Sequence, residues 1–334
     1  MPDIRKQQAK TWAARRLDWS TVNFEPASAD ASFRRYFRIV EDSNPKQESL
    51  ILMDSPSEHE PLAAFIDIAE RLSKAGLNVP KVHAADQELG FALLDDLGYQ
   101  PYHHVLNEDN AKDLFSDALD ALITMQVKTD ISGLPEYDAA LLFSELQLFP
   151  DWFLAKHWKV EPTEAELDDW EMICITLIRW ALDQPQVFCH RDFMPRNLMN
   201  TTPNPGVLDF QDAVLGPISY DPVCLFRDAF LSWPTERVDQ WLEDYRQRAL
   251  KASLPVTESA ELWRRTCDMI GVQRHLKVLG IFARIRYRDG KPHYLEDAAR
   301  FFGYLDTAIA RNPELQLLGQ LIQCWHKRSN QVGD

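Results

Sequence analysis

VFCHRDFMPRNLM at residues 187–199 and VLDFQDA at residues 207–213 decide the fold of this chain. Each stretch begins with a short apolar run and passes directly into polar residues, which is typical of a strand that ends in a loop. The polar residues include Asp192, Asn197 and Asp209. Asn197 follows Asp192 by five positions, and Asp209 follows Asn197 by twelve. Two loops of this kind can present all three side chains to one cleft.

These residue types suit phosphoryl transfer. A carboxylate at Asp192 can orient and deprotonate an attacking hydroxyl group. The amide oxygen of Asn197 and the carboxylate of Asp209 are ligands that Mg²⁺ prefers, because this hard cation binds oxygen. A structural alternative has Asp192 as a helix N-cap and Asn197 as a turn residue. The complete pattern HxDxxxxN, with an apolar-apolar-Asp-Phe turn after it, favours the catalytic interpretation.

The strings HRDFMPRN and LDFQDA resemble the aminoglycoside phosphotransferase and choline kinase superfamily, whose members are related to protein kinases. The resemblance implies that Asp192 is the catalytic base and that Asn197 and Asp209 hold Mg²⁺. It also implies a scaffold role for Gly216 and Asp221 in the downstream string GPISYDPV.

Two further assignments follow from the same resemblance. His190 would brace the catalytic loop. The segment FALLDDLG, which ends at Gly98, matches the hinge between two lobes, where backbone groups near Leu94 and Asp96 would contact adenine. The superfamily therefore implies ATP and Mg²⁺ as cofactors.

The rest of the chain fits a bilobal α+β fold of the protein-kinase type. A helix, two strand-like runs, a helix and two more runs predict a small antiparallel sheet. These segments are a helix to about Leu17, strands at Phe33–Val40 and Leu50–Met53 joined by a turn in EDSNPKQE, a helix at Ala63–Ala75, and strands at Val79–Ala84 and Phe91–Leu94. Long amphipathic helices follow from Glu108. We predict an N-terminal nucleotide-binding lobe, residues 1–97, and a helical C-terminal lobe, residues 98–334, with the catalytic and substrate site.

The N-terminal lobe departs from the family pattern in three places. A Gly-rich loop over the phosphates is missing, since the first of the twelve glycines is Gly76. The strand that usually carries a phosphate-binding lysine reads LILMDSP, with Met53 or Asp54 in that position. The position eleven before Gly76, where the glutamate partner of that lysine belongs, is Phe65. The lysine and the glutamate are missing together, as expected of a lost ion pair.

Two interpretations of these departures stay open. Either the chain is a pseudokinase that has lost ATP handling, or another cation neutralises the phosphates. Arg34 and Arg35 lie in SADASFRRYF, which stands in place of the Gly-rich loop, and guanidinium groups suit phosphate oxygens. The alternative for both arginines is an exposed strand face. The intact set of Asp192, Asn197 and Asp209 favours an active enzyme.

A basic helical segment, GVQRHLKVLGIFARIRYRDGK, bears on the charge of the substrate. Arg274, Lys277, Arg284 and Arg288 follow one another at spacings of three, seven and four, which places them on one stripe of a helix. Such a stripe in an acidic protein favours an anionic ligand, and the alternative is a solvated face. We expect Arg274 and Lys277, one turn apart, to converge on one carboxylate.

The chain also resembles one branch of the superfamily in ASFRRYFR, LILMDSP and the basic helix. That branch, which also lacks the lysine, contains the anomeric kinases of amino sugars in bacterial cell-wall recycling. The resemblance implies ATP-dependent phosphorylation of the C1 hydroxyl of N-acetylmuramate and N-acetylglucosamine, with the lactyl carboxylate of N-acetylmuramate on the basic stripe. A kinase of another small alcohol or sugar, and a catalytically silent pseudokinase that senses a sugar, are the alternatives.

Composition sets limits on partners and location. With 36 basic and 51 acidic residues the net charge is −15, which argues against a nucleic acid or an anionic membrane surface as partner. The five cysteines include no CxxC pair, as expected of reduced thiols. The charged N-terminal segment lacks the apolar core of a secretory signal, and no stretch has bilayer length. We expect a soluble, cytoplasmic protein that binds a small amino sugar, with no obligate protein partner inferred.

Overall fold

The structure, a computed structural model, describes residues 3–19, 22–28, 34–41, 49–56 and 62–332. The chain forms two compact units, which are Met1–Asp130 with Pro195–Asp212 and Ile131–Met194 with Ala213–Asp334. The catalytic motif is divided between them, since Asp192 belongs to the second unit and Asn197 to the first. The lobe boundary predicted between residues 97 and 98 lies inside the first unit. The division into a nucleotide-binding lobe and a catalytic lobe at this point stays a prediction.

The first unit is built on a five-stranded antiparallel sheet with the order β1-β2-β3-β5-β4. The strands are β1 (Val22–Ser28), β2 (Arg35–Glu41), β3 (Leu50–Asp54), β4 (Val82–Asp86) and β5 (Phe91–Asp95). Strand β1 was not predicted from the sequence, because Glu25 and Pro26 interrupt its apolar pattern. Proline is tolerated there because β1 is an edge strand. The predicted turn in EDSNPKQE lies, apart from Glu41, outside the described residues.

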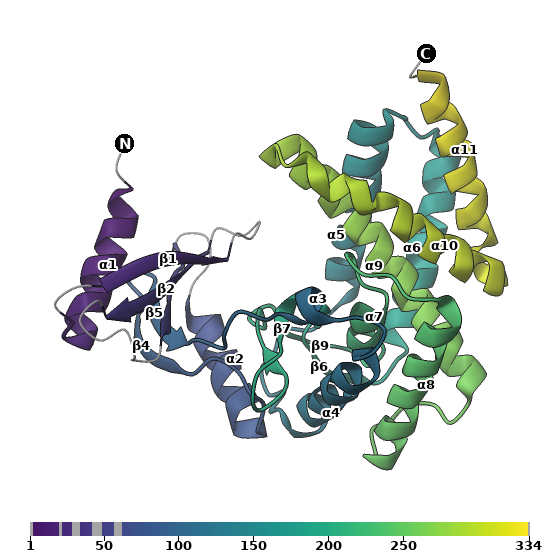
Figure 1. The fold of residues 1–334 in the computed structure, drawn as a ribbon. Coiled ribbons are helices and arrows are strands. Elements are labelled where there is room, and N and C mark those ends of the chain that lie inside the picture. The colour runs from purple at the N-terminus through teal and green to yellow at the C-terminus, as the bar shows by residue number, and fades with distance from the viewer. Residues whose placement is uncertain (1–2, 20–21, 29–33, 42–48, 57–61, 333–334) are drawn as a thin grey trace. The chain divides into compact units, whose positions relative to one another are not determined.

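Helix α1 (Ile4–Leu17) covers one face of this sheet (Figure 1). Side chains alternate between the faces of a strand, and Leu52 and Leu93 form a core cluster with Trp12 of α1. Ile51, next to Leu52, faces the other way and lines a cavity. The remaining elements of this unit are α2 (Leu62–Ala75), α3 (Tyr102–Val105), α4 (Ala111–Lys128), a 3₁₀ turn at Pro195–Asn197, β7 (Leu198–Met199) and β8 (Gly206–Val207).

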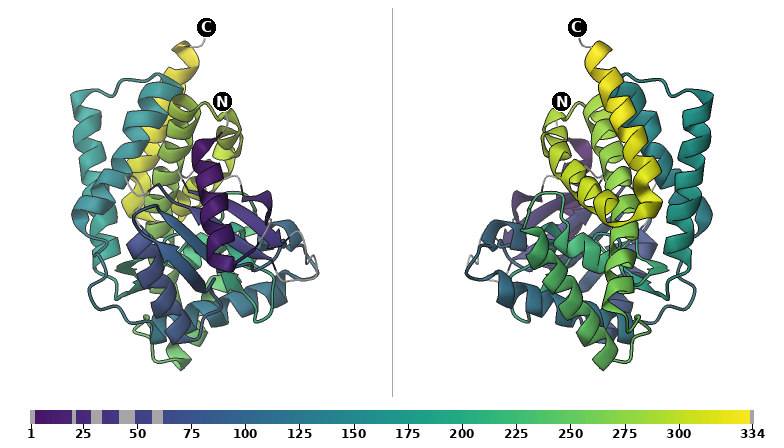
Figure 2. Two further views of the ribbon diagram at one scale, coloured as in Figure 1. Left: turned by 90° about the vertical axis from the view of Figure 1, so that its left-hand side faces the viewer. Right: turned by 90° about the vertical axis from the view of Figure 1, so that its right-hand side faces the viewer.

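The second unit is organised around α9 (Ala260–Asp289), which is buried on all sides over its middle turns (Figures 1 and 2). The side chain of Ser259 caps its first turn, and Gly290 ends it in the left-handed conformation with φ +69°. At Gly280 the helix lies directly against another backbone. A Cβ atom there would lie 2.3 Å from the carbonyl carbon of Leu148, so only glycine fits.

Other helices pack around α9, and two short strands carry the loop predicted to be catalytic. These elements are α5 (Ala139–Leu148), a π-helical segment at Phe149–Trp158, α6 (Glu164–Leu182), β6 (Gln186–Cys189), β9 (Val214–Pro217), α7 (Tyr220–Phe226), α8 (Thr235–Lys251), 3₁₀ turns at Pro292–Asp297 and Pro313–Leu315, α10 (Ala298–Arg311) and α11 (Gln316–Val332). The N-terminal antiparallel sheet and the mainly helical remainder confirm the predicted α+β class. All five cysteines are free thiols. Among the described helices, none combines the length and apolar character needed to cross a bilayer.

Candidate active site

A cavity of about 490 Å³ lies within the first unit, in the size range of small-molecule sites. Its described walls come from the sheet face opposite α1, from Phe65 of α2, from the segment after β5, and from the segment between Arg196 and Phe210. Apolar side chains line two sides of it, namely Ile51, Leu94, Met199 and Leu208. The structure brings four of the predicted residues to this cavity, which are Leu94, Asp96, Asn197 and Asp209.

The carboxylate of Asp96 fixes the segment that follows β5. It accepts hydrogen bonds from Arg38 Nη2 at 2.8 Å, from Ser49 Oγ at 2.5 Å and from Gly98 N at 3.0 Å. Burial opposes ionisation of this carboxyl, but these donors outweigh it and lower the pKa of Asp96. Arg38 also lies over the ring of Tyr99, 3.5 Å from its centroid. The backbone at the predicted adenine contact is thus held in place by the Asp96 side chain.

Asn197 and Asp209, the predicted metal ligands, lie next to each other. Asn197 Nδ2 donates to Asp209 Oδ2 at 3.3 Å, and Gln211 Nε2 donates to Asp209 Oδ1 at 2.9 Å. Gln211 Nε2 also contacts Asp212 Oδ2 at 3.3 Å. Asp209 has a left-handed backbone conformation, with φ +62°. This conformation is unfavourable for residues other than glycine, and such residues cluster at active sites and ligand-binding sites. Gln211 and Asp212 were not predicted as site residues, although both belong to the string LDFQDA.

The oxygens of this cluster fit Mg²⁺. This ion uses one or two carboxylates and completes its shell with water and phosphate oxygens. Gln211 Oε1 is buried and has no hydrogen-bond partner among the described residues, so it is a further oxygen donor beside Asp209. No group of three His, Cys, Asp or Glu side chains suited to a metal gathers in the part of the chain that the structure describes. The amide oxygens of Asn197 and Gln211 would therefore supplement the carboxylate of Asp209.

Phe65 of α2 stands where the family pattern has a glutamate. Its ring stacks on Phe210, the residue after Asp209, with the ring centroids 4.9 Å apart. Met53, at one candidate position for the missing lysine, is fully buried in β3. Apolar packing therefore connects α2 to the Asp-Phe turn where the family pattern has an ion pair.

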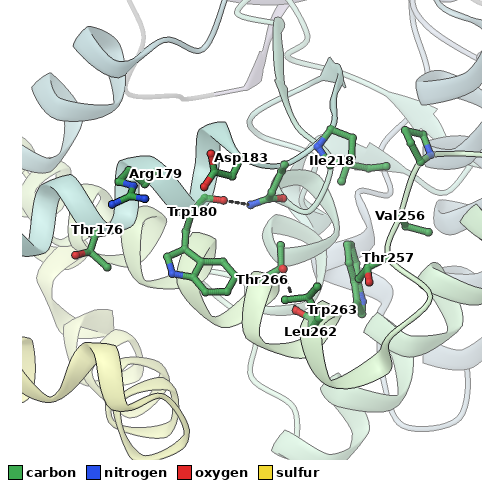
Figure 3. Close-up of a pocket in the computed structure, with 13 residues that line it drawn as sticks. Thr176, Arg179, Trp180, Asp183, Ile218, Val256, Thr257, Leu262, Trp263 and Thr266 are labelled. Carbon is green, nitrogen blue, oxygen red and sulfur yellow. Dashed lines mark hydrogen bonds between the residues drawn. The ribbon is translucent and has the colours of Figure 1, made fainter.

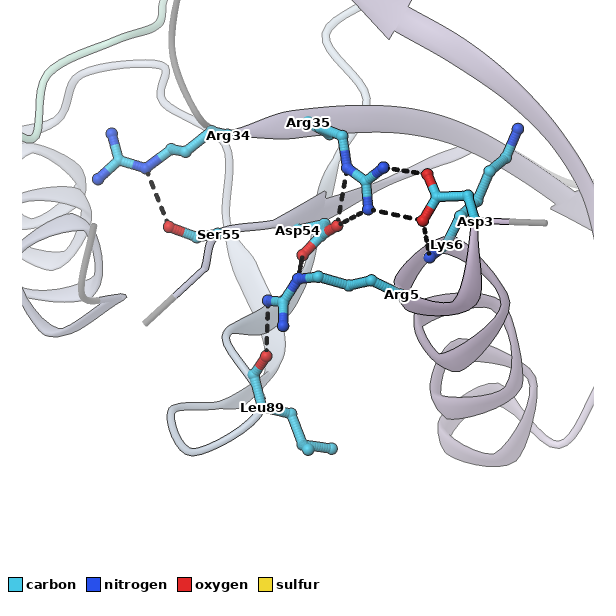
Figure 4. Close-up of polar contacts among 8 residues, drawn as sticks. All are labelled: Asp3, Arg5, Lys6, Arg34, Arg35, Asp54, Ser55 and Leu89. Carbon is cyan, nitrogen blue, oxygen red and sulfur yellow. Dashed lines mark hydrogen bonds and ion pairs between the residues drawn. The ribbon is translucent and has the colours of Figure 1, made fainter. Parts of the chain in front are cut away.

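Asp54, at the end of β3, is a buried carboxylate between two arginines (Figure 4). Arg5 Nε donates to Asp54 Oδ1 at 2.6 Å, and Arg35 Nη2 donates to Asp54 Oδ2 at 2.5 Å. Arg35 also pairs with Asp3, the N-cap residue of α1. This cluster fastens α1 to the sheet and engages Arg35 within the protein, which argues against the predicted role of Arg35 toward phosphates.

Arg34 extends away from this cluster (Figure 4). Its side chain is buried, and its Nε lies 3.3 Å from Ser55 Oγ. Residues 29–33, which belong to the stretch in place of the Gly-rich loop, lie outside the described residues.

The loop of the second unit that is predicted to be catalytic follows β6 and is held by Asp221. Asp221 Oδ2 accepts from His190 N at 2.7 Å, and Asp221 Oδ1 accepts from Arg191 N at 2.9 Å. Burial raises the pKa of Asp221, although these amides favour its ionised form. The amide of Asp192 donates to His190 Nδ1 at 3.3 Å. A Cβ atom on Gly216 of β9 would lie 2.9 Å from a side chain of β6, so the two strands pack closely there. These contacts are those expected of the scaffold residues predicted at His190, Gly216 and Asp221, and the scaffold role itself stays a prediction.

The predicted basic stripe divides into two parts along α9. Arg274 and Lys277 are buried, whereas Arg284 is half-buried. Arg288 is exposed and pairs with its neighbour Asp289, with Nε 2.6 Å from Oδ1. Shared helical spacing therefore does not give the four cations a shared environment.

Lys277 is already paired inside the protein. Its Nζ lies 2.8 Å from Glu145 Oε1 and 3.3 Å from Tyr220 Oη. A charge engaged in this way is poorly placed to bind a substrate carboxylate, so the geometry argues against this part of the prediction.

Arg274 has a different environment. Among the described residues its guanidinium makes one hydrogen bond, from Nη1 to Arg227 O at 3.3 Å, and no ion pair within 4.0 Å. Burial opposes its charge, but Cys224, Tyr220 and Asp192 lie near enough to raise the pKa of Arg274 above its ordinary value. A buried guanidinium held charged with so few direct partners is suited to an anionic ligand.

A second cavity, of about 600 Å³, lies in the second unit between the end of α6 and the start of α9 (Figure 3). Some of its polar groups are used within the protein. Thr266 Oγ1 donates to Leu262 O at 2.9 Å, and the indole N–H of Trp263 donates to Leu242 O at 2.9 Å. None of the predicted site residues lines this cavity, so it is not the site of the predicted chemistry.

The sequence was compared with protein families and curated proteins. The profile of the phosphotransferase enzyme family (APH) matches residues 23–263. The N-acetylmuramate/N-acetylglucosamine kinase of Pseudomonas aeruginosa is 52% identical over 331 residues, which cover 96% of each chain. The protein of the same name from Pseudomonas putida is 49% identical over 330 residues, also 96% of each chain. A third, from Neisseria meningitidis, is 39% identical and covers 95% of each chain.

Solved structures with a similar fold are far more distant in sequence. The choline kinase of Cryptosporidium parvum superposes with a TM-score of 0.63 at 12% identity, over 96% of this chain and 100% of that one. The ADP-bound aminoglycoside phosphotransferase APH(2'')-Ib superposes with a TM-score of 0.58 at 14% identity, over 89% and 97%. At these identities the similarity establishes the kinase-like fold alone.

Proposed function

Because this chain belongs to the phosphotransferase enzyme family, we propose that it is an ATP-dependent kinase of the amino sugars N-acetylmuramate and N-acetylglucosamine. Relatives up to 52% identical over nearly the whole chain carry the names of both sugars. The acceptor would be the anomeric C1 hydroxyl, which gives the enzyme a place in cell-wall sugar recycling. The observation that carries the kinase proposal is the pairing of Asn197 with Asp209 in a cavity of small-molecule size.

The nucleotide would bind in the cavity of the first unit. Adenine would lie between Leu94 and Leu208, beside the backbone that Asp96 holds, and the phosphates would extend toward Asn197 and Asp209. These last two residues would hold Mg²⁺, with Gln211 beside them. When bound, the ion neutralises negative charge on the phosphates.

In the reaction, the C1 hydroxyl oxygen forms a bond to the γ-phosphorus of ATP, and the bond from that phosphorus to the β–γ bridging oxygen breaks. Asp192 takes the hydroxyl proton, and the products are ADP and a sugar 1-phosphate. The hemiacetal hydroxyl at C1 is the most acidic hydroxyl of a reducing sugar, which suits a carboxylate base. Asp221 and His190 would keep the loop of Asp192 in place through the hydrogen bonds described above.

Arg34, rather than Arg35, is the arginine that we propose for the phosphates, since Asp54 and Asp3 engage Arg35. Arg34→Gln is expected to raise the KM for ATP about tenfold, the effect of one charge-assisted hydrogen bond, without changing the KM for the sugar. Arg35→Gln is expected to lower the melting temperature and leave the KM for ATP nearly unchanged. Steady-state kinetics and thermal unfolding of both variants separate the two roles. Wild-type ATP kinetics in both variants and in the double variant would mean that another group neutralises the phosphates.

Asn197→Ala and Asp209→Ala are expected to raise the Mg²⁺ concentration needed for half-maximal activity. The shift should be roughly tenfold, which is the lower end of the loss in metal affinity when a residue of a metal site is substituted. It should be larger for Asp209→Ala, because that substitution also removes a negative charge. Titrating Mg²⁺ against activity at saturating ATP checks this. An unchanged Mg²⁺ response in both variants would place the ligands elsewhere.

A panel of sugars and small alcohols, scored for ATP-dependent phosphorylation, tests the proposed function itself. We expect both amino sugars to yield 1-phosphates with one ADP each, detected by phosphorus NMR. Phosphorylation of only a different alcohol would identify another kinase. Sugar binding without any phosphorylation would indicate a catalytically silent sensor. The absence of the usual lysine and of a Gly-rich loop would fit such a protein.

A further inference from the structure

We infer that Glu145 of α5 is a positioning residue for the phosphoryl transfer, because it holds the residue directly before Asp192. The inference rests on the proposed role of Asp192 as the base. Glu145 is only 6% exposed and lies outside the strings HRDFMPRN, LDFQDA and GPISYDPV. Its carboxylate accepts from four side chains, which are Arg191 Nη2, Tyr137 Oη, Lys277 Nζ at 2.8 Å and Gln273 Nε2 at 3.1 Å.

Arg191 is the residue through which Glu145 acts on the catalytic loop. It is not glycine, yet its φ is +72°, a left-handed conformation that the surrounding contacts must sustain. Asp221 Oδ1 fixes its amide at 2.9 Å, and Cys224 Sγ donates to its carbonyl at 3.2 Å. Glu145 fixes its side chain. Because the amide, the carbonyl and the side chain are all held, the direction in which the chain enters Asp192 is set.

The charge of Glu145 is needed for this arrangement. Burial opposes its ionised form, but the charges of Lys277 and Arg191 outweigh burial and lower the pKa of Glu145. Burial also raises the pKa of Tyr137, so its hydroxyl keeps the proton that it donates. A neutral residue in place of Glu145 leaves the two cations without this shared counter-ion. We expect the less buried cation, Arg191, to move, and the loop to move with it.

Glu145→Gln keeps the volume of the side chain and removes its charge. We expect kcat to fall roughly tenfold, because a misplacement of about 1 Å can cost about 10²-fold and the amide and carbonyl of Arg191 stay held in this variant. The KM for ATP should stay nearly unchanged, since the nucleotide cavity is lined by residues of the first unit. The matched control is Asp268→Asn, which removes another fully buried carboxylate of the second unit, paired with Arg227 at 2.6 Å. This control should lose similar thermal stability and keep its kcat.

Hydrogen exchange of a peptide that contains residues 190–194 reports on the loop without any substrate. Exchange should be faster in Glu145→Gln than in Asp268→Asn. Arg191→Gln should reproduce the loss in kcat, and the double variant should lose no more than either single variant, because both remove the same contact. If Glu145→Gln does not fold, Glu145→Asp keeps the charge on a shorter side chain and should show a smaller effect in the same direction.

Two results would overturn the inference while leaving the proposed function intact. One is an unchanged kcat and unchanged exchange in folded Glu145→Gln, and the other is an equal loss of kcat in Asp268→Asn. A wild-type protein that phosphorylates no sugar would instead refute the proposed function. The exchange comparison would then decide whether Glu145 holds the loop, independently of any activity.

Discussion

Asp192→Asn is expected to lower kcat by at least ~10², the usual loss when a general base is removed. The amide has nearly the same volume as the carboxylate but cannot accept the proton of the C1 hydroxyl. The KM for ATP should change little, because the residues that line the nucleotide cavity are not altered. The loss should therefore appear in kcat for both amino sugars, measured as sugar 1-phosphate formed per unit time at saturating ATP.

The control for this substitution is Asp183→Asn, an exposed carboxylate at the end of α6 that lies outside the proposed machinery. It should have wild-type kinetics and a wild-type melting temperature. Nucleotide binding to Asp192→Asn, measured by calorimetry with ADP, should also match that of the wild type and would show that the variant is folded. Near-normal turnover in such a folded variant would remove Asp192 from the role of base.

The proximity of Asn197 and Asp209 could be predicted from the sequence because it depends on short, local spacings. Asn197 and Asp209 lie twelve positions apart on two loops that end short strands, and the structure joins them at 3.3 Å. Asp221, thirty-one positions from His190, could be assigned only through the resemblance to a family. Physical patterns in the sequence alone do not connect residues that far apart.

Glu145 and β1 show where prediction from sequence ends. Glu145 contacts Arg191 across forty-six positions and stands in LLFSELQL, where its spacing reads as that of an ordinary helix. Strand β1 has too few alternating apolar residues to be recognised without its partner β2. In both cases the decisive interaction is tertiary. The basic stripe is limited for a related reason, since helical periodicity tells which residues share a face but not what covers that face. It did not predict that Lys277 pairs with Glu145 while Arg274 makes no ion pair among the described residues.

Arg274→Gln is expected to reduce kcat/KM for N-acetylmuramate about ten- to a hundred-fold more than for N-acetylglucosamine. N-acetylmuramate carries a lactyl carboxylate that the other sugar lacks, and a charge-assisted hydrogen bond contributes roughly 1.5–3 kcal/mol. Arg274 is the candidate because its buried guanidinium makes one hydrogen bond, to Arg227 O, and no ion pair among the described residues. Specificity constants for both sugars, measured side by side, give the selectivity directly.

Lys277→Gln is the informative comparison, because Lys277 lies one turn away on α9 but already pairs with Glu145 at 2.8 Å. Its loss should affect the two sugars equally, since it disturbs a contact that serves both reactions. Equal losses for the two sugars in Arg274→Gln as well would make Arg274 part of the scaffold, and the carboxylate would then be bound elsewhere or not at all. A selective loss in Lys277→Gln with none in Arg274→Gln would assign the carboxylate to Lys277 instead of Arg274. Glu145 would then have to release Lys277 when the acidic sugar binds. The structure favours equal losses for the two sugars in Lys277→Gln and a selective loss in Arg274→Gln. A lysine with a buried carboxylate partner must lose that partner before it can bind another anion.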